Sequence, residues 1–422
     1  MKRFNYIAKI ITMCIAVQVI FFASLRAQNN TNSPYSLYGY GSLVNDGFST
    51  SQAMAGTSIA TRSKYAINPT NPASYSSSDS TTFLFEMGVS GLFTTLTNDA
   101  GYNVTGNGNL DYITLQTPLT KWMGLSAGLT PFSYTGYSYS VSDSIVIPGR
   151  DSTNYYTQSY YGSGGISQVY LGLSFNIANH VSLGVNGYYM YGNINNYKAV
   201  SYSSSENTTY STVRNSYMTI NNFNMRFGIQ YYETIGRKHA FNIGAIYEYK
   251  SGLNGSYNEI TYGTDTIEFN SEDLFELPAL YGFGVSYTYD NRMTFAVDYQ
   301  LQQFADALYY GVTDSLCNSS TISVGSEYIH NPNGRTYADR ILWRAGVSYN
   351  NSYIKVNDNQ AYKFTLTCGV GLPLRTSKTI INIGLEYGNI GTYNYTAVNE
   401  NYLKLCVNLS LNETWFVKSK IR

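Results

Sequence analysis

Long stretches of this chain alternate between apolar and polar residues. The clearest cover residues 169–177 and 223–231, where every second side chain is apolar. Because successive side chains of a β-strand point to opposite faces, this period predicts strands with one apolar and one polar face. Each stretch covers about 9 to 11 residues or more, the length that a tilted strand needs to cross a bilayer. Further copies lie at 181–191, 241–249, 281–289, 293–299, 341–349, 364–372, 381–387 and 403–411.

The links between these stretches alternate in length. The links after even-numbered strands are short, as at 179–180 and 290–291, whereas those after odd-numbered strands are mostly long, as at 141–162 and 251–277. Short periplasmic turns that alternate with long outer loops are typical of outer-membrane barrels, and a soluble β-sandwich has no reason to sort its loops in this way. The predicted fold is therefore all-β, a transmembrane antiparallel β-barrel. We expect about fourteen strands, starting near residues 81, 109, 123, 163, 181, 218, 239, 278, 292, 321, 339, 361, 379 and 401.

Composition and charge exclude two other classes of protein. The 422 residues contain 26 Lys and Arg against 26 Asp and Glu, and this balance gives no electrostatic footprint for nucleic acid. After residue 27 no unbroken apolar run reaches even half of the ~20 residues that a membrane-spanning helix needs, so a helical membrane protein is excluded. The 44 Tyr residues, many of them at the ends of apolar stripes, suit the aromatic girdles of a membrane barrel.

Residues 1–27 have the features of a secretory signal peptide. The segment begins with Lys2 and Arg3, continues with an apolar run over 10–25, and ends on the small residue Ala27. Such a segment directs export and is removed from the mature protein. The alternative is a short N-terminal anchor helix, but the apolar run is shorter than a membrane span. Export and a barrel fold together predict the bacterial outer membrane as the location.

Residues 28–80 lack the alternating pattern, and the predicted barrel occupies residues 81–422. The earlier segment is rich in Gly, Ser, Asn and small apolar residues and carries turn signals at Asn68-Pro69 and Asn71-Pro72. A barrel of this size is wider than one whose own side chains fill the interior. We therefore expect residues 28–80 to form an N-terminal hatch inside the lumen.

Three short motifs within this segment carry a resemblance to a known family. They are SPYSLYGYG at 33–41, AMAGT at 53–57 and NPAS at 71–74. They resemble the hatch of the long-chain fatty acid transporter (FadL/TodX-like) family of outer-membrane proteins, and the closing strands resemble those of its divergent members. The resemblance covers nearly the whole mature chain. The hatch-motif residues that it assigns are Gly39, Gly41, Met54, Gly56, Asn71, Pro72 and Ala73.

The resemblance implies a function as well as a fold. It implies a barrel with the same number of strands as the links predict, and passage of hydrophobic molecules such as long-chain fatty acids across the outer membrane. The hatch would occlude the pore, and a kink in the third strand would open the wall sideways. The same resemblance implies a monomeric barrel embedded in outer-membrane lipid, with no cofactor.

Thr130 and Pro131 interrupt the third predicted strand. The alternation is regular from Met123 to Leu129 and then stops. Proline cannot donate to the hydrogen-bond ladder, so within a barrel it occupies a bulge, a kink or an unpaired stretch. Two interpretations stay open: Pro131 forms the lateral-opening kink, or it lies just above the membrane band where pairing is looser.

The sequence contains no pattern that predicts an enzyme or a metal site. The three histidines, His180, His239 and His330, lie in or beside turns, where a solvated side chain is the simplest interpretation. A serine–histidine hydrolase needs a histidine held beside its nucleophile, and none of the three is so placed. Charged residues on the polar phase of the strands, such as Arg226 and Asp298, are expected to face the lumen and tie down the hatch.

Two functions remain after these exclusions. The first is a channel that binds hydrophobic small molecules in the lumen and releases them sideways through the wall. The second is a barrel of the same fold that serves as an interaction or secretion partner and transports no solute. Apolar hatch residues favour the first, because a lumen otherwise prefers polar lining, although ordinary packing against the wall explains them equally well. These proposed ligand-lining residues are Leu37, Leu43, Phe48, Met54 and Ile59.

Overall fold

The structure is a computed structural model of the 422-residue chain. It describes residues 30–44, 47–79, 81–98, 101–146, 153–203, 210–263, 266–272, 274–356, 358–374, 379–392 and 398–414. The expected signal peptide, residues 1–27, lies outside these described residues.

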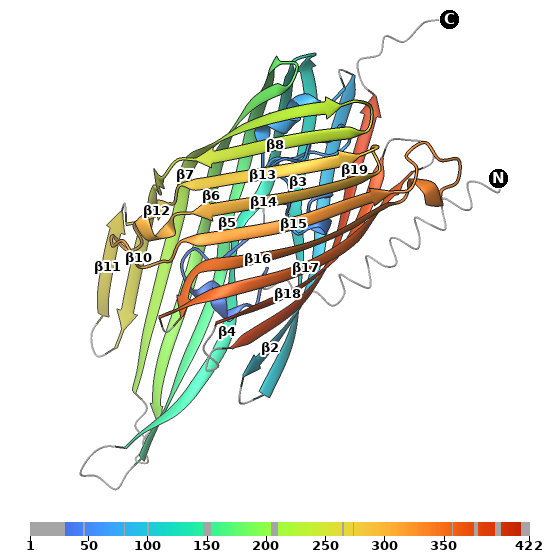
Figure 1. Ribbon diagram of the computed structural model, residues 1–422. Helices are drawn as coiled ribbons and strands as arrows, with labels where there is room; N and C mark the ends of the chain where they lie inside the picture. The colour runs from blue at the N-terminus through green and yellow to red at the C-terminus, as the bar shows by residue number, and fades with distance from the viewer. Residues whose placement is uncertain are drawn as a thin grey trace, which may run out of the picture.

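Fourteen antiparallel strands close into one barrel within the described part of the chain (Figure 1). Each strand pairs with its neighbour along the chain, and the last pairs with the first through the register Cys406↔Ser90. The predicted fold class and strand number are confirmed, and most predicted starts lie within a few residues of the observed ones. The wall consists of β2 (Thr82–Asn98), β3 (Gly101–Thr120), β4 (Met123–Val146), β5 (Thr153–Ala178), β6 (Val181–Ser203), β7 (Tyr210–Ile235), β8 (His239–Glu248), β13 (Leu280–Tyr289), β14 (Met293–Gln302), β15 (Ser319–Ile329), β16 (Leu342–Val356), β17 (Asn359–Pro373), β18 (Ile380–Thr392) and β19 (Asn399–Thr414).

The period-two pattern sorts side chains between the two faces of the wall. In β7, Phe227 and Ile229 are 44% and 45% exposed on the outer face, whereas Arg226 and Gln230 are buried on the inner face. The outer surface of a membrane barrel is apolar because it contacts lipid, and the inner surface can remain polar. The alternation read from the sequence therefore describes which side chains face the lumen.

Four neighbouring strands project beyond the others at one end of the barrel (Figure 1). β4 has 24 residues, β5 and β7 have 26 each, and β6 has 23. The predicted long link over 141–162 is wrong in this respect, because most of its residues belong to β4 and β5. Outside the membrane both faces of a strand meet water, so a strand there needs no apolar stripe and loses the period-two signal. We call this the tall end of the barrel.

A further hairpin extends the wall at the tall end. β10 (Gly255–Tyr262) pairs with the upper part of β7, and β11 (Thr266–Glu272) pairs with β10. The lower part of β7 pairs instead with β8. Two short strands, β9 (Ser251–Gly252) and β12 (Glu276–Leu277), join this hairpin to the barrel. The described residues of the predicted long link 251–277 are therefore largely strand.

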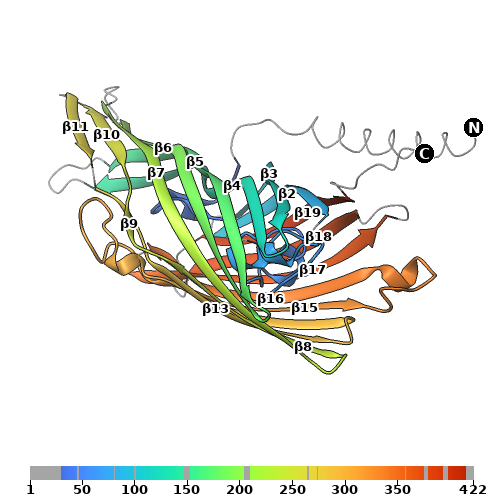
Figure 2. The same cartoon turned by 90° about the horizontal axis from the view of Figure 1, so that it is seen from above.

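The N-terminal segment, residues 30–79, lies inside the barrel (Figure 2). It contains η1 (Pro34–Leu37), the short strand β1 (Ser42–Leu43), η2 (Gln52–Met54) and η3 (Pro72–Ser77). The remaining short helices, η4 (Phe304–Asp306) and η5 (Ala338–Arg340), belong to the links between wall strands.

Glycines in the wall let the N-terminal segment approach closely. A Cβ atom added at Gly325 would lie 2.7 Å from Met54 Cβ, and one added at Gly346 would lie 2.8 Å from Met54 Cα. Real Cβ atoms do not come this near to other atoms, so η2 packs directly against the backbone of β15 and β16. This contact fixes the height of the segment within the lumen.

Candidate lateral opening and lumen cavity

The hydrogen-bonded wall is split between β3 and β4. The two strands pair from Thr120↔Met123 up to Ile113↔Leu129. Above that point β3 continues in register with β2 only, and β4 continues in register with β5. Within the described residues, the upper halves of β3 and β4 therefore form no ladder with each other. A lateral opening requires such a break, since every backbone group in a continuous wall is paired.

Thr130 and Pro131 lie where the two strands separate. Leu129 is the last residue of β4 that pairs with β3, and Pro131 has no N–H to donate to a continued ladder. The register of β4 against β5 shifts between Pro131 and Ser133, so Phe132 is the extra residue of a bulge. A bulge bends its strand and increases the local twist, which turns β4 away from β3.

The N-terminal segment covers the split from the inside. β1 pairs with the free edge of β4 through Ser42↔Tyr134 and Leu43↔Ser133, and the Val44 N–H donates to the Phe132 carbonyl at 3.0 Å. The Tyr134 hydroxyl reaches the Leu110 carbonyl of β3 at 3.5 Å. Ser42 and Leu43 thus form a short strand that pairs with β4 beyond the point where β3 stops pairing with it.

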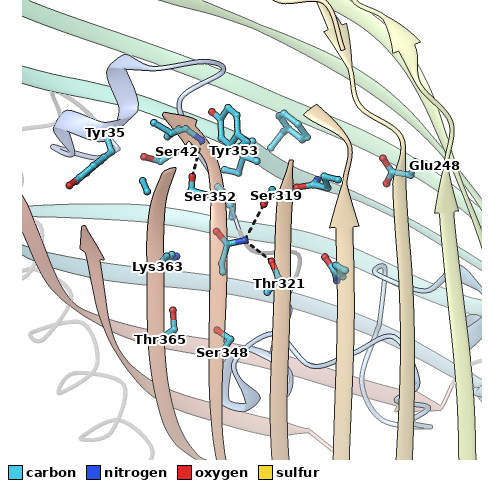
Figure 3. A pocket seen from close by; sticks show the side chains of 18 of the residues that line it. Tyr35, Ser42, Glu248, Ser319, Thr321, Ser348, Ser352, Tyr353, Lys363 and Thr365 are labelled. Carbon is cyan, nitrogen blue, oxygen red and sulfur yellow. Dashed lines mark hydrogen bonds between the residues drawn. The ribbon is translucent and has the colours of Figure 1, made fainter. Parts of the chain in front are cut away.

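Three separate cavities lie around Val44, next to the pairing of β1 with β4. The lumen cavity has a volume of about 180 Å³ and is lined by Leu43, Glu248 and Lys363 among others (Figure 3). A narrow cavity of about 20 Å³ adjoins Thr130 and Pro131. A third, of about 120 Å³, lies beside Tyr134. All three share Val44 in their linings, so the residue next to β1 separates lumen from split.

Charged side chains face the lumen in pairs. Arg226 is ion-paired with Glu248, and its guanidinium also lies over the Tyr188 ring at 5.5 Å. Elsewhere the lumen holds the pairs Arg344–Glu327 at 2.6 Å and Lys404–Asp111 at 3.3 Å. The expectation that the polar phase faces the lumen is confirmed. A buried charge is costly unless it is paired, so these pairs keep a polar lumen stable.

Asp298 holds the middle of the N-terminal segment. One carboxylate oxygen accepts the Ser58 N–H at 2.5 Å and the Ile59 N–H at 2.8 Å. On another side of the barrel, Asn382 donates to Ser49 Oγ at 2.8 Å. The sequence placed Asp298 on the polar face of its strand, and the structure shows the backbone that it binds.

The proposed hatch-motif residues serve mainly to turn the backbone. Gly39, Gly41 and Gly56 adopt φ angles of +59°, +87° and +85°, which side chains rarely tolerate. Asn71 accepts a hydrogen bond from Ala73 N–H at 3.1 Å and thereby caps η3, whose first residue is Pro72. These residues therefore shape the backbone of the N-terminal segment itself. A role of the hatch motif in gating is a proposal.

The five proposed ligand-lining residues divide into two groups. Leu37, Leu43 and Phe48 each line a cavity, and Phe48 stacks on Tyr112 of β3 at 4.2 Å. Met54 and Ile59 are fully packed and line none of these cavities. Of these five residues, Leu43 and Phe48 therefore lie between the lumen and the split, beside Val44.

Sequence reasoning missed Tyr353 of β16. Its hydroxyl accepts the Tyr40 N–H at 3.1 Å and donates to the Gly41 carbonyl, and its ring stacks on Phe304 at 4.4 Å. Tyr353 lies in β16 beyond the alternating stretch 341–349. Because the alternation has ended there, the sequence does not predict which face of the wall its side chain takes. It is visible near Ser42 in Figure 3.

The potential metal ligands of the described residues form no metal site. No group of three or more His, Cys, Asp or Glu side chains within them could hold a metal ion. His180 lies 3.0 Å from Glu233 and His239 lies 2.8 Å from the Tyr287 hydroxyl, both at exposed positions. No helix of the described chain is long and apolar enough to span a membrane.

Solved structures of outer-membrane channels share this fold. A FadL homologue from Pseudomonas aeruginosa matches with a TM-score of 0.57 at 14% identity, covering 89% of this chain and 100% of that one. The P. putida toluene transporter TodX matches with a TM-score of 0.56 at 13% identity, covering 89% and 100%. The Ralstonia pickettii toluene transporter TbuX matches with a TM-score of 0.55 at 14% identity, covering 87% and 98%. At these identities the likeness concerns the fold, and it confirms the resemblance that the hatch motifs carried.

No curated protein sequence matches this chain. A family model described as BamG matches residues 7–422, which is nearly its full length. The protein therefore belongs to the BamG family.

Proposed function

We propose that this protein is an outer-membrane channel for uptake of hydrophobic molecules, with lateral release between β3 and β4. The observation that carries the proposal is the wall split above Ile113↔Leu129, where β1 of the N-terminal segment pairs with β4 in place of β3. The likeness to FadL-type and toluene transporters supports a channel of this class. In this proposal the tall end faces outward, and the N-terminal segment acts as the hatch.

The proposed route runs from the tall end to the lumen cavity and then sideways. Withdrawal of Leu43 and Val44 from the edge of β4 would join the lumen cavity to the split. A hydrophobic solute that left through the short-turn end would instead re-enter water, at a cost of ~0.8 kcal/mol for each re-exposed methylene. Exit into the bilayer is therefore favoured for a long acyl chain, and long-chain fatty acids are the first class to test.

A disulfide that locks β1 onto β4 tests this proposal. Ser42 and Tyr134 are register partners, so S42C/Y134C places the two thiols on adjacent strands. The native Cys317, Cys368 and Cys406 are first replaced by Ser, and the fourth cysteine, Cys14, lies in the expected signal peptide. We expect uptake of a labelled long-chain fatty acid to stop under oxidation and to return after reduction.

The matched control is a lock within the continuous part of the wall. Ser326 and Ala345 are register partners in β15 and β16, so S326C/A345C forms a crosslink that opposes no proposed movement. Its uptake should equal that of the Cys-free parent. Full uptake by an oxidised S42C/Y134C protein, with the crosslink verified by mass spectrometry, would contradict lateral release at this split.

A second function, as an interaction or secretion partner, is favoured by how firmly the segment is held. Asp298, Gln230, Asn382 and Asn186 bind it from different parts of the wall. A barrel that serves as a platform need not open. In that case the oxidised S42C/Y134C protein would still bind its partner, and the Cys-free parent would show no solute uptake.

A further inference from the structure

A cleft at the tall end is lined largely by tyrosines. It has a volume of about 330 Å³, and its floor is the turn Leu37–Gly39 of the N-terminal segment. Its walls include Tyr160 of β5, Tyr257 of β10 and Tyr310, which follows η4. We call this the tyrosine cleft. Its lining residues come from strands on several sides of the mouth, so a molecule bound there would bridge them.

Three cations line the same cleft, and no carboxylate does. Lys198, Arg214 and Lys355 are among its lining residues, and no Asp or Glu of the described chain is. Arg214 is paired with Glu259 at 2.5 Å. Lys198 lies over the Tyr160 ring at 5.1 Å, and within the described residues neither Lys198 nor Lys355 forms an ion pair. The cleft therefore carries a positive charge that its own residues do not neutralise.

A second cavity lies on the other side of Tyr38. It has a volume of about 520 Å³ and is lined by Tyr38, Tyr102 and Tyr139, again without a carboxylate among its described lining residues. Tyr139 stacks on Tyr160 at 5.0 Å, which connects the two cavities through a continuous aromatic surface. The two spaces together offer an elongated site with several ring faces in sequence.

This combination matches the chemistry of an acidic sugar chain. Aromatic faces pack against the C–H faces of sugar rings, and phenol and amide groups provide hydrogen bonds for hydroxyls. Ammonium groups provide charge-assisted hydrogen bonds for carboxylate or phosphate. The hydroxyls of Tyr137, Tyr257 and Tyr309 already donate within the protein, to Asn196, Glu259 and the Gly39 carbonyl, and they can still accept hydrogen bonds from a sugar. An acyl chain fits less well, because its methylene groups offer no partner to the ammonium groups of the cleft.

We propose that the tyrosine cleft and the adjoining cavity bind an oligosaccharide that carries carboxylate or phosphate groups. The site lies apart from the β3–β4 split, at the tall end where the proposed solute route begins, and one of its lining residues is Leu37. Such a sugar chain could be free in solution or part of the glycan of a surface lipopolysaccharide. Both sources present the same chemistry to the cleft.

Binding to the detergent-solubilised full-length protein tests the proposal. The probes are hexagalacturonate, the neutral maltohexaose of the same length, and delipidated lipopolysaccharide core oligosaccharide, each titrated by isothermal calorimetry. We expect at least one acidic probe to bind about tenfold or more tightly than maltohexaose. Binding of hexagalacturonate would indicate a free acidic sugar, and binding of the core oligosaccharide alone would indicate the surface glycan. Equal binding of maltohexaose, or no binding of any probe, would overturn the proposal.

Two pairs of variants place the binding in the cleft. K198Q/K355Q should lower the affinity for the acidic probe by about tenfold or more. K121Q, in a short turn at the opposite end of the barrel, should leave that affinity unchanged. Y160L removes a ring face that lines the cleft, and Y161L removes the neighbouring ring that points to the other face of β5. Loss of affinity in Y160L but not in Y161L is the expected result. Unchanged affinity in both K198Q/K355Q and Y160L would overturn the assignment.

Discussion

Single residues mark both the break in the wall's ladder and the anchoring of the N-terminal segment. At Asp298 one carboxylate oxygen accepts two backbone N–H groups of the N-terminal segment, and a charge-assisted bond of this kind is about twice as strong as a neutral one. At Pro131 the opposite occurs: the ladder between β3 and β4 ends at Leu129, and Pro131 has no N–H to donate to its continuation. The same wall thus holds the N-terminal segment at one strand and lacks a ladder beside another.

Replacing Pro131 with Val tests the break. Val restores an N–H that can join a ladder, so pairing between β3 and β4 can extend beyond Leu129. We expect lower uptake of long-chain hydrophobic solutes with unchanged surface abundance and heat-modifiable mobility. As a control, Pro373→Val alters the end of β17 far from the split and should leave uptake unchanged. Normal uptake by correctly folded P131V would remove this residue from the mechanism.

At the scale of elements, the sequence predicts the lower wall well and the tall end poorly. The lower strands carry apolar residues that face lipid, and this stripe marks their phase and most of their starts. Tyr160 belongs to β5 as well, but it lies in the predicted link 141–162, where no apolar stripe marks a strand. The alternating pattern over 293–299 predicts that Asp298 faces the lumen. Tyr353 lies outside any alternating stretch, so the sequence does not predict which face it takes.

The candidate lateral opening depends on which strands pair with each other, and the alternation of residues along the sequence does not show this. The Thr130-Pro131 interruption marks a place on β4, but the departure of β3 is visible only in the pairing of two strands. The pairing of β1 with β4 joins residues that are about ninety positions apart, and Ser42 and Leu43 carry no strand signal of their own. Such contacts are set by how the N-terminal segment fits the lumen.

Packing of η2 against the wall gives a prediction at the same scale. In Gly346→Val the new side chain would begin 2.8 Å from Met54 Cα, so η2 or the strand must move. Overpacking of this kind costs about 1–3 kcal/mol, and we expect a lower urea midpoint of unfolding in detergent. Gly106→Val is the matched control, because its nearest neighbour would be 3.7 Å away. Equal midpoints for the two variants would show that η2 tolerates displacement.

At the scale of the whole molecule, the barrel and the segment inside it depend on each other unequally. Strand pairing alone closes the wall, from β2 through β19, and requires no residue before Thr82. The segment, in contrast, takes its hydrogen bonds from side chains all around the lumen, including Asn186 and Asn382. The barrel should therefore fold without the segment, but the segment should not keep its conformation without the barrel.

Deletion of residues 28–80 tests this asymmetry together with the proposed hatch. The N-terminal segment fills the lumen and leaves cavities of only about 20 to 180 Å³ around Val44, so its removal should open a continuous water-filled pore. We expect the truncated protein to keep its heat-modifiable barrel and to show a much larger single-channel conductance in planar bilayers than the full-length protein, because β-strand bonds alone hold the wall. Deleting the hairpin residues 255–272 controls for truncation itself, since β10 and β11 lie at the mouth and pair only with the upper part of β7. A folded barrel without residues 28–80 that conducts no better than the intact chain would mean that another part of the molecule closes the pore.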